Sequence, residues 1–86
     1  MIGDKIKELR KKNGLTLQEL ADTLNSEYPD TINFNKGKIS KWENNREEPR
    51  LSSVKILADF FSVPLDYFDD KDNSQLEIVS IYNELK

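Results

Sequence analysis

Apolar residues recur at helical spacing in several short segments, and turn-forming residues separate these segments. The first segment ends at Asn13 and Gly14, where glycine suits the left-handed conformation that closes a helix. A capping box, TLQE at 16–19, begins the second segment. The segments predict five helices, each with an apolar side that would face a common core. These apolar residues are Ile2, Ile6 and Leu9; Leu17, Leu20, Ala21 and Leu24; Ile39 and Trp42; Val54, Leu57, Ala58 and Phe61; and part of SVPLDYF at 62–68. Because strand signals are missing from the sequence, we predict an all-α fold.

The composition limits the functions that are open to the chain. Its 86 residues suffice for one domain with a single small core, and they include no cysteine and no histidine. Disulfides and thiolate metal sites are therefore excluded, and the commonest general base is missing. No apolar run approaches the ~20 residues of a membrane span, and the N-terminus lacks a signal-peptide core. We predict a cytoplasmic protein that is not an enzyme, needs no metal or cofactor and does not enter a membrane.

The net charge of −3 conceals an uneven distribution of charge along the chain. Basic residues outnumber acidic ones in two blocks, residues 1–12 and 36–50, whereas residues 13–35 and 59–86 are predominantly acidic. Binding to nucleic acid depends on local positive patches rather than on the global charge. The acidic composition therefore leaves nucleic-acid binding open at the two basic blocks.

The segment FNKGKISKWENN combines one of these blocks with a predicted third helix at 36–44. Asn35 is a good N-cap for this helix. Ile39 and Trp42 fall on its inward side, with Glu43 at the edge of that side. The opposite face carries Gly37, Ser40, Lys41 and Asn44, and the flanks carry Lys36 and Lys38.

The start of this predicted helix is locally unfavourable. Lysines in a first turn oppose the helix dipole at roughly 0.3–1 kcal/mol each, and Gly37 costs up to about 1 kcal/mol relative to alanine. Segments that break local rules tend to be functional sites. A DNA backbone lying along the helix would offset the lysine penalty, and a glycine on the outer face allows a close approach. The alternative is a lysine-rich face that is merely solvated, and charge alone does not decide between the two.

Across residues 4–68 the sequence resembles the Cro/CI-type (lambda repressor-like) helix-turn-helix family of phage and bacterial transcriptional repressors. The resemblance spans about three quarters of the chain and is carried by IKELRKKNGLTLQELADTLN and KGKISKWENNREEPRLSSVKILADFFSVPLDYF. It implies a compact five-helix bundle that binds a double-stranded DNA operator in a sequence-specific manner. It also implies repression by occlusion, in which the bound protein excludes polymerase.

The resemblance further implies roles for individual residues. The helix at 17–25 matches the positioning helix, and the helix at 36–44 matches the recognition helix of the major groove. The residues implied to contact DNA are Lys36, Gly37, Lys38, Ser40 and Lys41 at base edges, Asn44, Asn45 and Arg46 at phosphates, and Gln18 at the start of the positioning helix. The family also implies an ion pair between Arg10 and Glu19, the alternative being that Arg10 is a free surface arginine. For Trp42 a place in the core is favoured over base stacking.

The sequence departs from the family pattern at two places. Leu17 stands where the family usually has glutamine, and Gln18 follows it. A helix-turn-helix normally joins its helices by three or four residues, yet about nine, 26–34, intervene here. We expect Phe34 to pack into the core just before the cap. We interpret the rest of the turn, including Tyr28, as a bulge into solvent rather than a DNA contact.

We divide the chain into a helix-turn-helix DNA-binding domain at 1–68 and an acidic linker with the start of a further helix at 69–86. The apolar residues of this last segment are Leu76, Ile78, Val79, Ile81 and Leu85. They could fold back on the bundle, pair with a second copy or lead to a further C-terminal region, and the resemblance favours the last. We expect a homodimer on a palindromic operator. The alternative function is an antitoxin-like or other protein-binding regulator that uses the acidic segment to bind its partner.

Overall fold

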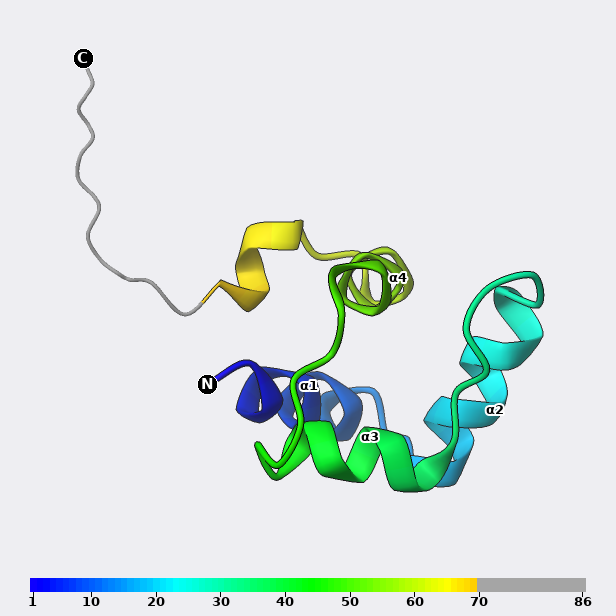
Figure 1. Ribbon diagram of the computed structural model, residues 1–86, viewed down its shortest axis with the longest axis horizontal. Coiled ribbons are helices and arrows are strands. Elements are labelled where there is room, and N and C mark those ends of the chain that lie inside the picture. Colours follow the sequence, from blue (N-terminus) through cyan, green and yellow to red (C-terminus); the bar gives the residue numbers. More distant parts are fainter. Residues whose placement is uncertain (70–86) are drawn as a thin grey trace, which may run out of the picture.

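Four α-helices and one 3₁₀ turn build the part of the protein that the computed structural model describes, residues 1–69 (Figure 1). The elements are α1 (Ile2–Lys12), α2 (Leu17–Glu27), α3 (Lys36–Glu43), α4 (Leu51–Phe61) and η1 (Leu65–Phe68). No strand occurs among residues 1–69, in agreement with the predicted all-α class. The further helix expected within 69–86 lies outside the described residues, apart from Asp69.

The predicted fifth α-helix is wrong, because η1 is a 3₁₀ turn. The amide of Tyr67 donates to the carbonyl of Pro64 at 3.0 Å, and the amide of Asp69 donates to Asp66 at 3.0 Å, each spanning three residues. The preceding helix α4 ends at Phe61, and its cap residue Ser62 adopts a left-handed φ of 57°. The four residues of η1 are too few for a run of α-helical hydrogen bonds, and short helical pieces of this length favour the tighter 3₁₀ form.

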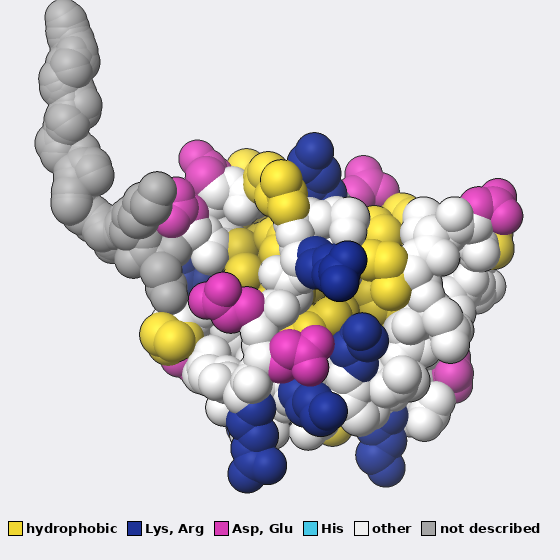
Figure 2. Space-filling view, in the orientation of Figure 1, with side chains coloured by type: hydrophobic (Ala, Val, Ile, Leu, Met, Phe, Trp, Pro, Cys, Tyr) yellow, Lys and Arg dark blue, Asp and Glu magenta, His cyan; other side chains and the backbone are white. Residues whose placement is uncertain are grey.

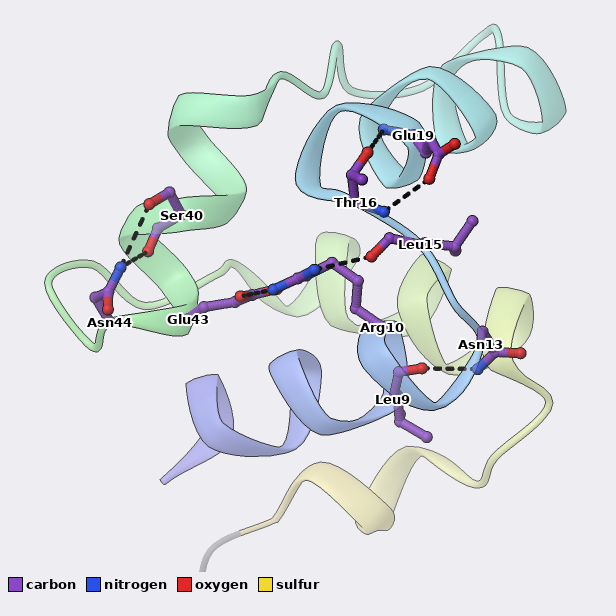
Figure 3. Close-up of polar contacts among 9 residues, drawn as sticks. All are labelled: Leu9, Arg10, Asn13, Leu15, Thr16, Glu19, Ser40, Glu43 and Asn44. Atoms are coloured by element: carbon purple, nitrogen blue, oxygen red, sulfur yellow. Dashed lines mark hydrogen bonds and ion pairs between the residues drawn. The ribbon is translucent and has the colours of Figure 1, made fainter.

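The junction between α1 and α2 follows the local signals in the sequence. Gly14 has a φ of +69°, and the amide of Leu15 donates back to the carbonyl of Arg10 at 3.1 Å, as in a glycine-closed helix end. The capping box of α2 is complete. The Glu19 amide donates to Thr16 Oγ1 at 3.0 Å, and the Thr16 amide donates to Glu19 Oε1 at 2.9 Å (Figure 3). Both predicted helix boundaries are confirmed.

The core joins all four helices, and α1 lies directly against α3 within it (Figure 1). The buried apolar side chains are Ile6, Leu9, Leu20, Ala21, Leu24, Phe34, Ile39, Trp42, Val54, Leu57, Ala58 and Phe68. The rings of Phe34 and Trp42 meet edge to face, with centroids 6.2 Å apart. Gly3 is buried where α1 approaches the end of α3 so closely that a Cβ there would overlap the carbonyl oxygen of Trp42. The expected core positions of Phe34 and Trp42 are confirmed.

The turn before α3 is packed against the core, so the predicted solvent bulge is wrong for its apolar residues. Helix α2 continues to Glu27, two residues beyond its predicted end. Tyr28 and Ile32 are half-buried against the core, and Tyr28 Oη donates to Asp59 Oδ2 of α4 at 2.6 Å. The turn thus carries two apolar side chains back onto the bundle, where their partial burial stabilises the fold.

Asn25 holds the end of this turn in a defined position. Its Nδ2 donates to the carbonyl of Phe34 at 2.8 Å, and its Oδ1 accepts from the amide of Phe34 at 2.8 Å. The side chain thus replaces a backbone partner for both polar groups of Phe34. Since Phe34 directly precedes the cap of α3, Asn25 helps to set the point at which that helix begins.

Candidate nucleic-acid interface

Helix α3 separates buried and exposed residues in the way its sequence predicts. Ile39, Trp42 and Glu43 are buried, whereas the other side of the helix faces solvent. The predicted contact residues of α3 on that side or its flanks are Lys36, Gly37 and Lys41, which are exposed, and Ser40 and Lys38, which are half-buried. In Figure 2, Lys and Arg side chains stand out over and below the region that α3 occupies in Figure 1. The structure thus gathers the basic residues of 36–50 on one helix and the loop after it.

The N-terminal end of α3 is favourable for negative charge. Asn35 caps the helix by accepting from the Lys38 amide at 2.8 Å, which confirms the predicted cap. No acidic residue lies in the first turn. The positive end of the helix dipole and the two lysines of this turn, Lys36 and Lys38, therefore add rather than cancel.

The predicted phosphate contacts lie at the other end of α3. Asn44 Nδ2 donates to the carbonyl and the Oγ of Ser40, at 2.8 and 3.3 Å, so these two predicted contact residues act as one polar unit (Figure 3). Asn45 has a left-handed φ of 57°, and the Arg46 amide donates back to Lys41 at 2.9 Å. This backbone reversal closes the helix and starts the loop, where Asn44, Asn45 and Arg46 are all exposed.

Lys38 lies on a different flank of α3 from Ser40 and Asn44. It lines a recess of about 240 Å³ between α3 and the start of α4. The other residues of this recess are Ile32, Trp42, Glu47, Glu48, Arg50, Ser52 and Ser53. Two carboxylates and one guanidinium thus share the recess with Lys38. Because Lys38 is half-buried, the exposed Lys36 and Lys41 are the better candidates for contact with an anion.

The predicted ion pair between Arg10 and Glu19 is wrong, and Arg10 is not a free surface residue either. Arg10 Nε donates to Glu43 Oε2 at 2.7 Å, and Nη2 donates to Oε1 at 3.0 Å (Figure 3). Arg10 Nη1 also donates to the carbonyl of Leu15 at 2.8 Å. The carboxylate of Glu19 is instead committed to its own helix cap. The two paired side chains are 11% and 4% exposed, respectively.

Glu43 is the structural residue that the sequence analysis missed. The signal was its place at the edge of the buried side of α3, since a carboxylate there needs a cationic partner. The hydrogen bonds from Arg10 to Glu43 raise the pKa of the guanidinium above its ordinary value. The guanidinium therefore stays charged at neutral pH, and its two hydrogen bonds to the carboxylate fix α3 against α1.

Gln18 lies apart from the interactions that organise α3. It is exposed in the first turn of α2, and its Nε2 donates to Asp22 Oδ1 at 3.0 Å. An acidic neighbour disfavours a phosphate at this position. The assignment of Gln18 as a DNA contact stays a prediction.

Comparison with known proteins identifies the kind of domain that the fold and the exposed helix represent. A family model described as a helix-turn-helix domain matches residues 3–73. The HTH-type transcriptional activator BcrR of Enterococcus faecalis is 35% identical over 63 residues, which are 73% of this chain and 27% of that protein. The chain thus spans about a quarter of the length of this relative. No solved structure matches the chain significantly. None of the helices within residues 1–69 has the length and apolar character that crossing a membrane requires.

Proposed function

Because the chain belongs to the helix-turn-helix domain family, we propose that it is a DNA-binding transcriptional regulator that places α3 in the major groove of an operator. The observation that carries this proposal is the division of α3 into two sides. The apolar side is buried and held by the Arg10–Glu43 pair, while Lys36, Gly37 and Lys41 are exposed. A major groove admits one helix and presents base edges to its outer side.

The proposal assigns different tasks to the two ends of α3. Lys36 and Lys41 would donate to guanine O6 and N7, contacts that discriminate between bases by about 1–3 kcal/mol each. Asn44, Asn45 and Arg46 would bind backbone phosphates, which position a protein on DNA but carry little sequence information. The exposure of these residues and the absence of an acidic residue from the first turn of α3 support this assignment.

We also propose that the protein acts as a Cro/CI-type repressor and binds as a homodimer to a palindromic site. The resemblance of residues 4–68 to that family supports the repressor assignment. The similar protein BcrR is named an activator. Whether a bound regulator represses or activates transcription depends on where its operator lies relative to the promoter. An operator that overlaps a promoter would exclude polymerase. A reporter with the operator placed over or upstream of a promoter distinguishes the two directions.

Selection of bound duplexes from a random DNA pool tests the proposal. We expect one enriched motif, with two inverted half-sites if the protein binds as a dimer. The same selection with Lys41→Ala should relax the preference at one base position. Lys55→Ala is the matched control, because Lys55 is an exposed lysine on α4 rather than on α3. A pool that shows no enrichment would contradict DNA recognition and favour the protein-binding alternative.

A further inference from the structure

An apolar groove lies on the side of the domain formed by the start of α1, the start of α4 and η1. Its volume is about 690 Å³. Apolar residues that line it include Ile2, Leu51, Val54, Leu65 and Phe68. Figure 2 shows hydrophobic side chains reaching the surface around the position of η1 and α4. No residue of α2 or α3 lines this groove, so it is separate from the candidate nucleic-acid interface.

The exposure of two leucines marks this groove as a docking surface. Leu51 is 61% exposed and Leu65 is 41% exposed, although both belong to helical elements that pack on the core. Single exposed apolar residues are common, but a contiguous apolar hollow is typical of a site that another apolar surface covers. Leu51 and Leu65 come from elements separated in sequence and line the same hollow.

The chain itself supplies a segment that fits this surface. Asp69, the last described residue, lines the groove, and residues 70–86 continue from that point. Ile78, Ile81, Tyr82 and Leu85 follow the sequence spacing i, i+3, i+4, i+7, which would align them on one face in a helical conformation. Ser80 and Glu84 fall on other sides of such a helix. We propose that this apolar stripe of residues 78–85 docks in the groove of its own domain.

Tether length favours the chain's own segment over a second copy. Residues 70–77 can span up to roughly 30 Å when extended, at about 3.3–3.6 Å per residue. That is more than the ~16 Å length of an eleven-residue helix such as α4. A short flexible tether gives an effective concentration in the millimolar range. At micromolar protein concentration the tethered segment therefore occupies the groove before a second molecule does.

The charges on the two surfaces indicate that apolar burial, and not electrostatic attraction, would drive the docking. The groove includes Asp66 and Asp69, the docking segment carries Glu84, and Glu77 ends the tether. Like charges at the two surfaces do not attract, so high salt should not weaken the docking. Docking at this surface also leaves the exposed side of α3 open, and it does not depend on DNA binding.

Paired cysteines in the full chain test the proposal directly, because the natural sequence contains no cysteine. Leu65→Cys is combined with Ile81→Cys, and the reduced protein is oxidised with glutathione disulfide at micromolar concentration. The matched control combines Leu65→Cys with Ser80→Cys, which has nearly the same tether but points to another side. We expect the first pair to form an intrachain disulfide at least tenfold faster than the control, at low and at high salt.

Two results would overturn the proposal. Equal rates for the two pairs would show that no face of the segment prefers the groove, and disulfide-linked dimers would assign the groove to a second copy. Thermal melting of Leu65→Ser, Ile81→Ser and the double variant provides an independent check. Docking predicts that the double variant loses less than the sum of the two single losses in melting temperature, whereas strictly additive losses contradict docking.

Discussion

Arg10 and Glu43 join the last turn of α1 to the last residue of α3 through two hydrogen bonds between the guanidinium and the carboxylate. Both side chains are largely buried, so each charge has lost most of its contact with water and is compensated by the other charge. The same guanidinium also binds the carbonyl of Leu15, at the start of the link to α2. Arg10 thus links α1, α3 and the start of the connection to α2 by hydrogen bonds, and this fixes the orientation of α3 relative to the rest of the domain.

Removal of one member of this pair should strongly destabilise the fold. We expect Arg10→Met to lower the free energy of unfolding by about 3 kcal/mol, because it leaves the Glu43 carboxylate buried without a cation. The melting temperature should fall by on the order of 10 °C in a domain of this size. Glu43→Gln should show a smaller loss of the same kind. Glu19→Gln is the control, since glutamine also completes a capping box, and its melting temperature should stay near that of the natural protein. Destabilisation by Glu19→Gln equal to that of Arg10→Met would contradict the observed pairing.

The hydrogen bond from Tyr28 to Asp59 should make stability depend on pH in the alkaline range. This bond, together with burial and the nearby charges of Asp59 and Glu27, raises the pKa of Tyr28 to about 12 in the folded protein. The unfolded value is about 10. A raised pKa stabilises the fold fully below the unfolded value, and that contribution is lost as the pH rises through the folded value. Tyr28→Phe should therefore be less stable by up to about 1 kcal/mol at pH 8, discounted for partial exposure. Urea unfolding at pH 8 and near pH 11.5 should show this difference shrinking, and a constant difference would exclude the tyrosine proton as its source.

Gly3 and Gly37 should respond in opposite ways to replacement by alanine. A Cβ on Gly3 would overlap the carbonyl of Trp42 and lie 2.7 Å from Asn45 Oδ1, so Gly3→Ala must separate α1 from α3. We expect a loss of about 1–3 kcal/mol in the free energy of unfolding, as for other overpacked sites. At Gly37 a Cβ would make an ordinary contact with Asn35 Oδ1 at 3.4 Å, so Gly37→Ala should gain up to about 1 kcal/mol of helix propensity. Chemical denaturation of the two variants provides the comparison. A stabilised Gly3→Ala variant would show that the two helices can move apart without cost.

Asn25 should be required for the long turn to hold its shape. Asn25→Ala would leave the amide and carbonyl of Phe34 without their present partners, at about 1–3 kcal/mol for each buried group. Asn25→Asp keeps the acceptor for the amide and removes the donor to the carbonyl, so we expect it to lie between alanine and the natural residue. Thermal melting of the three proteins gives this order.

Replacement of residues 26–33 by a three-residue turn should cause a larger loss of stability, because Tyr28 and Ile32 would leave the core surface. Unchanged melting of the shortened chain would contradict the packed turn.

The dependence of DNA binding on salt should report the number of phosphates that the protein contacts. The logarithm of affinity should fall linearly with the logarithm of salt concentration, with a slope of about −0.9 for each phosphate neutralised. Arg46→Ala should reduce that slope by about 1 on every sequence, whereas Lys41→Ala should act most strongly on the selected site. Fluorescence anisotropy across a salt series measures both effects. A flat salt response of the natural protein would contradict binding through the basic residues of α3 and its loop.

Local sequence determined the end of α1 and the starts of α2 and α3, because the interactions that decide them span only a few residues. Gly14 closes α1, the Thr16–Glu19 box starts α2, and Asn35 starts α3, and each of these was predictable from the residues within one turn. The buried and exposed sides of α3 followed from helical periodicity in the same way. Periodicity therefore places the residues proposed to contact DNA on the outer side of α3 or its flanks, and their contact with DNA stays a prediction.

Tertiary structure alone decided which distant groups become partners. Arg10 could have met Glu19 or Glu43, and only the approach of α1 to α3 selects the second, while the helix cap occupies the first. The turn before α3 had polar composition and a proline, yet Tyr28 reaches Asp59 on α4, at a separation of 31 residues. Such contacts depend on how complete helices pack, and no local pattern encodes the distance between them. The sequence by itself thus determined where α2 and α3 begin and which side of α3 is buried, and packing decided how the helices meet.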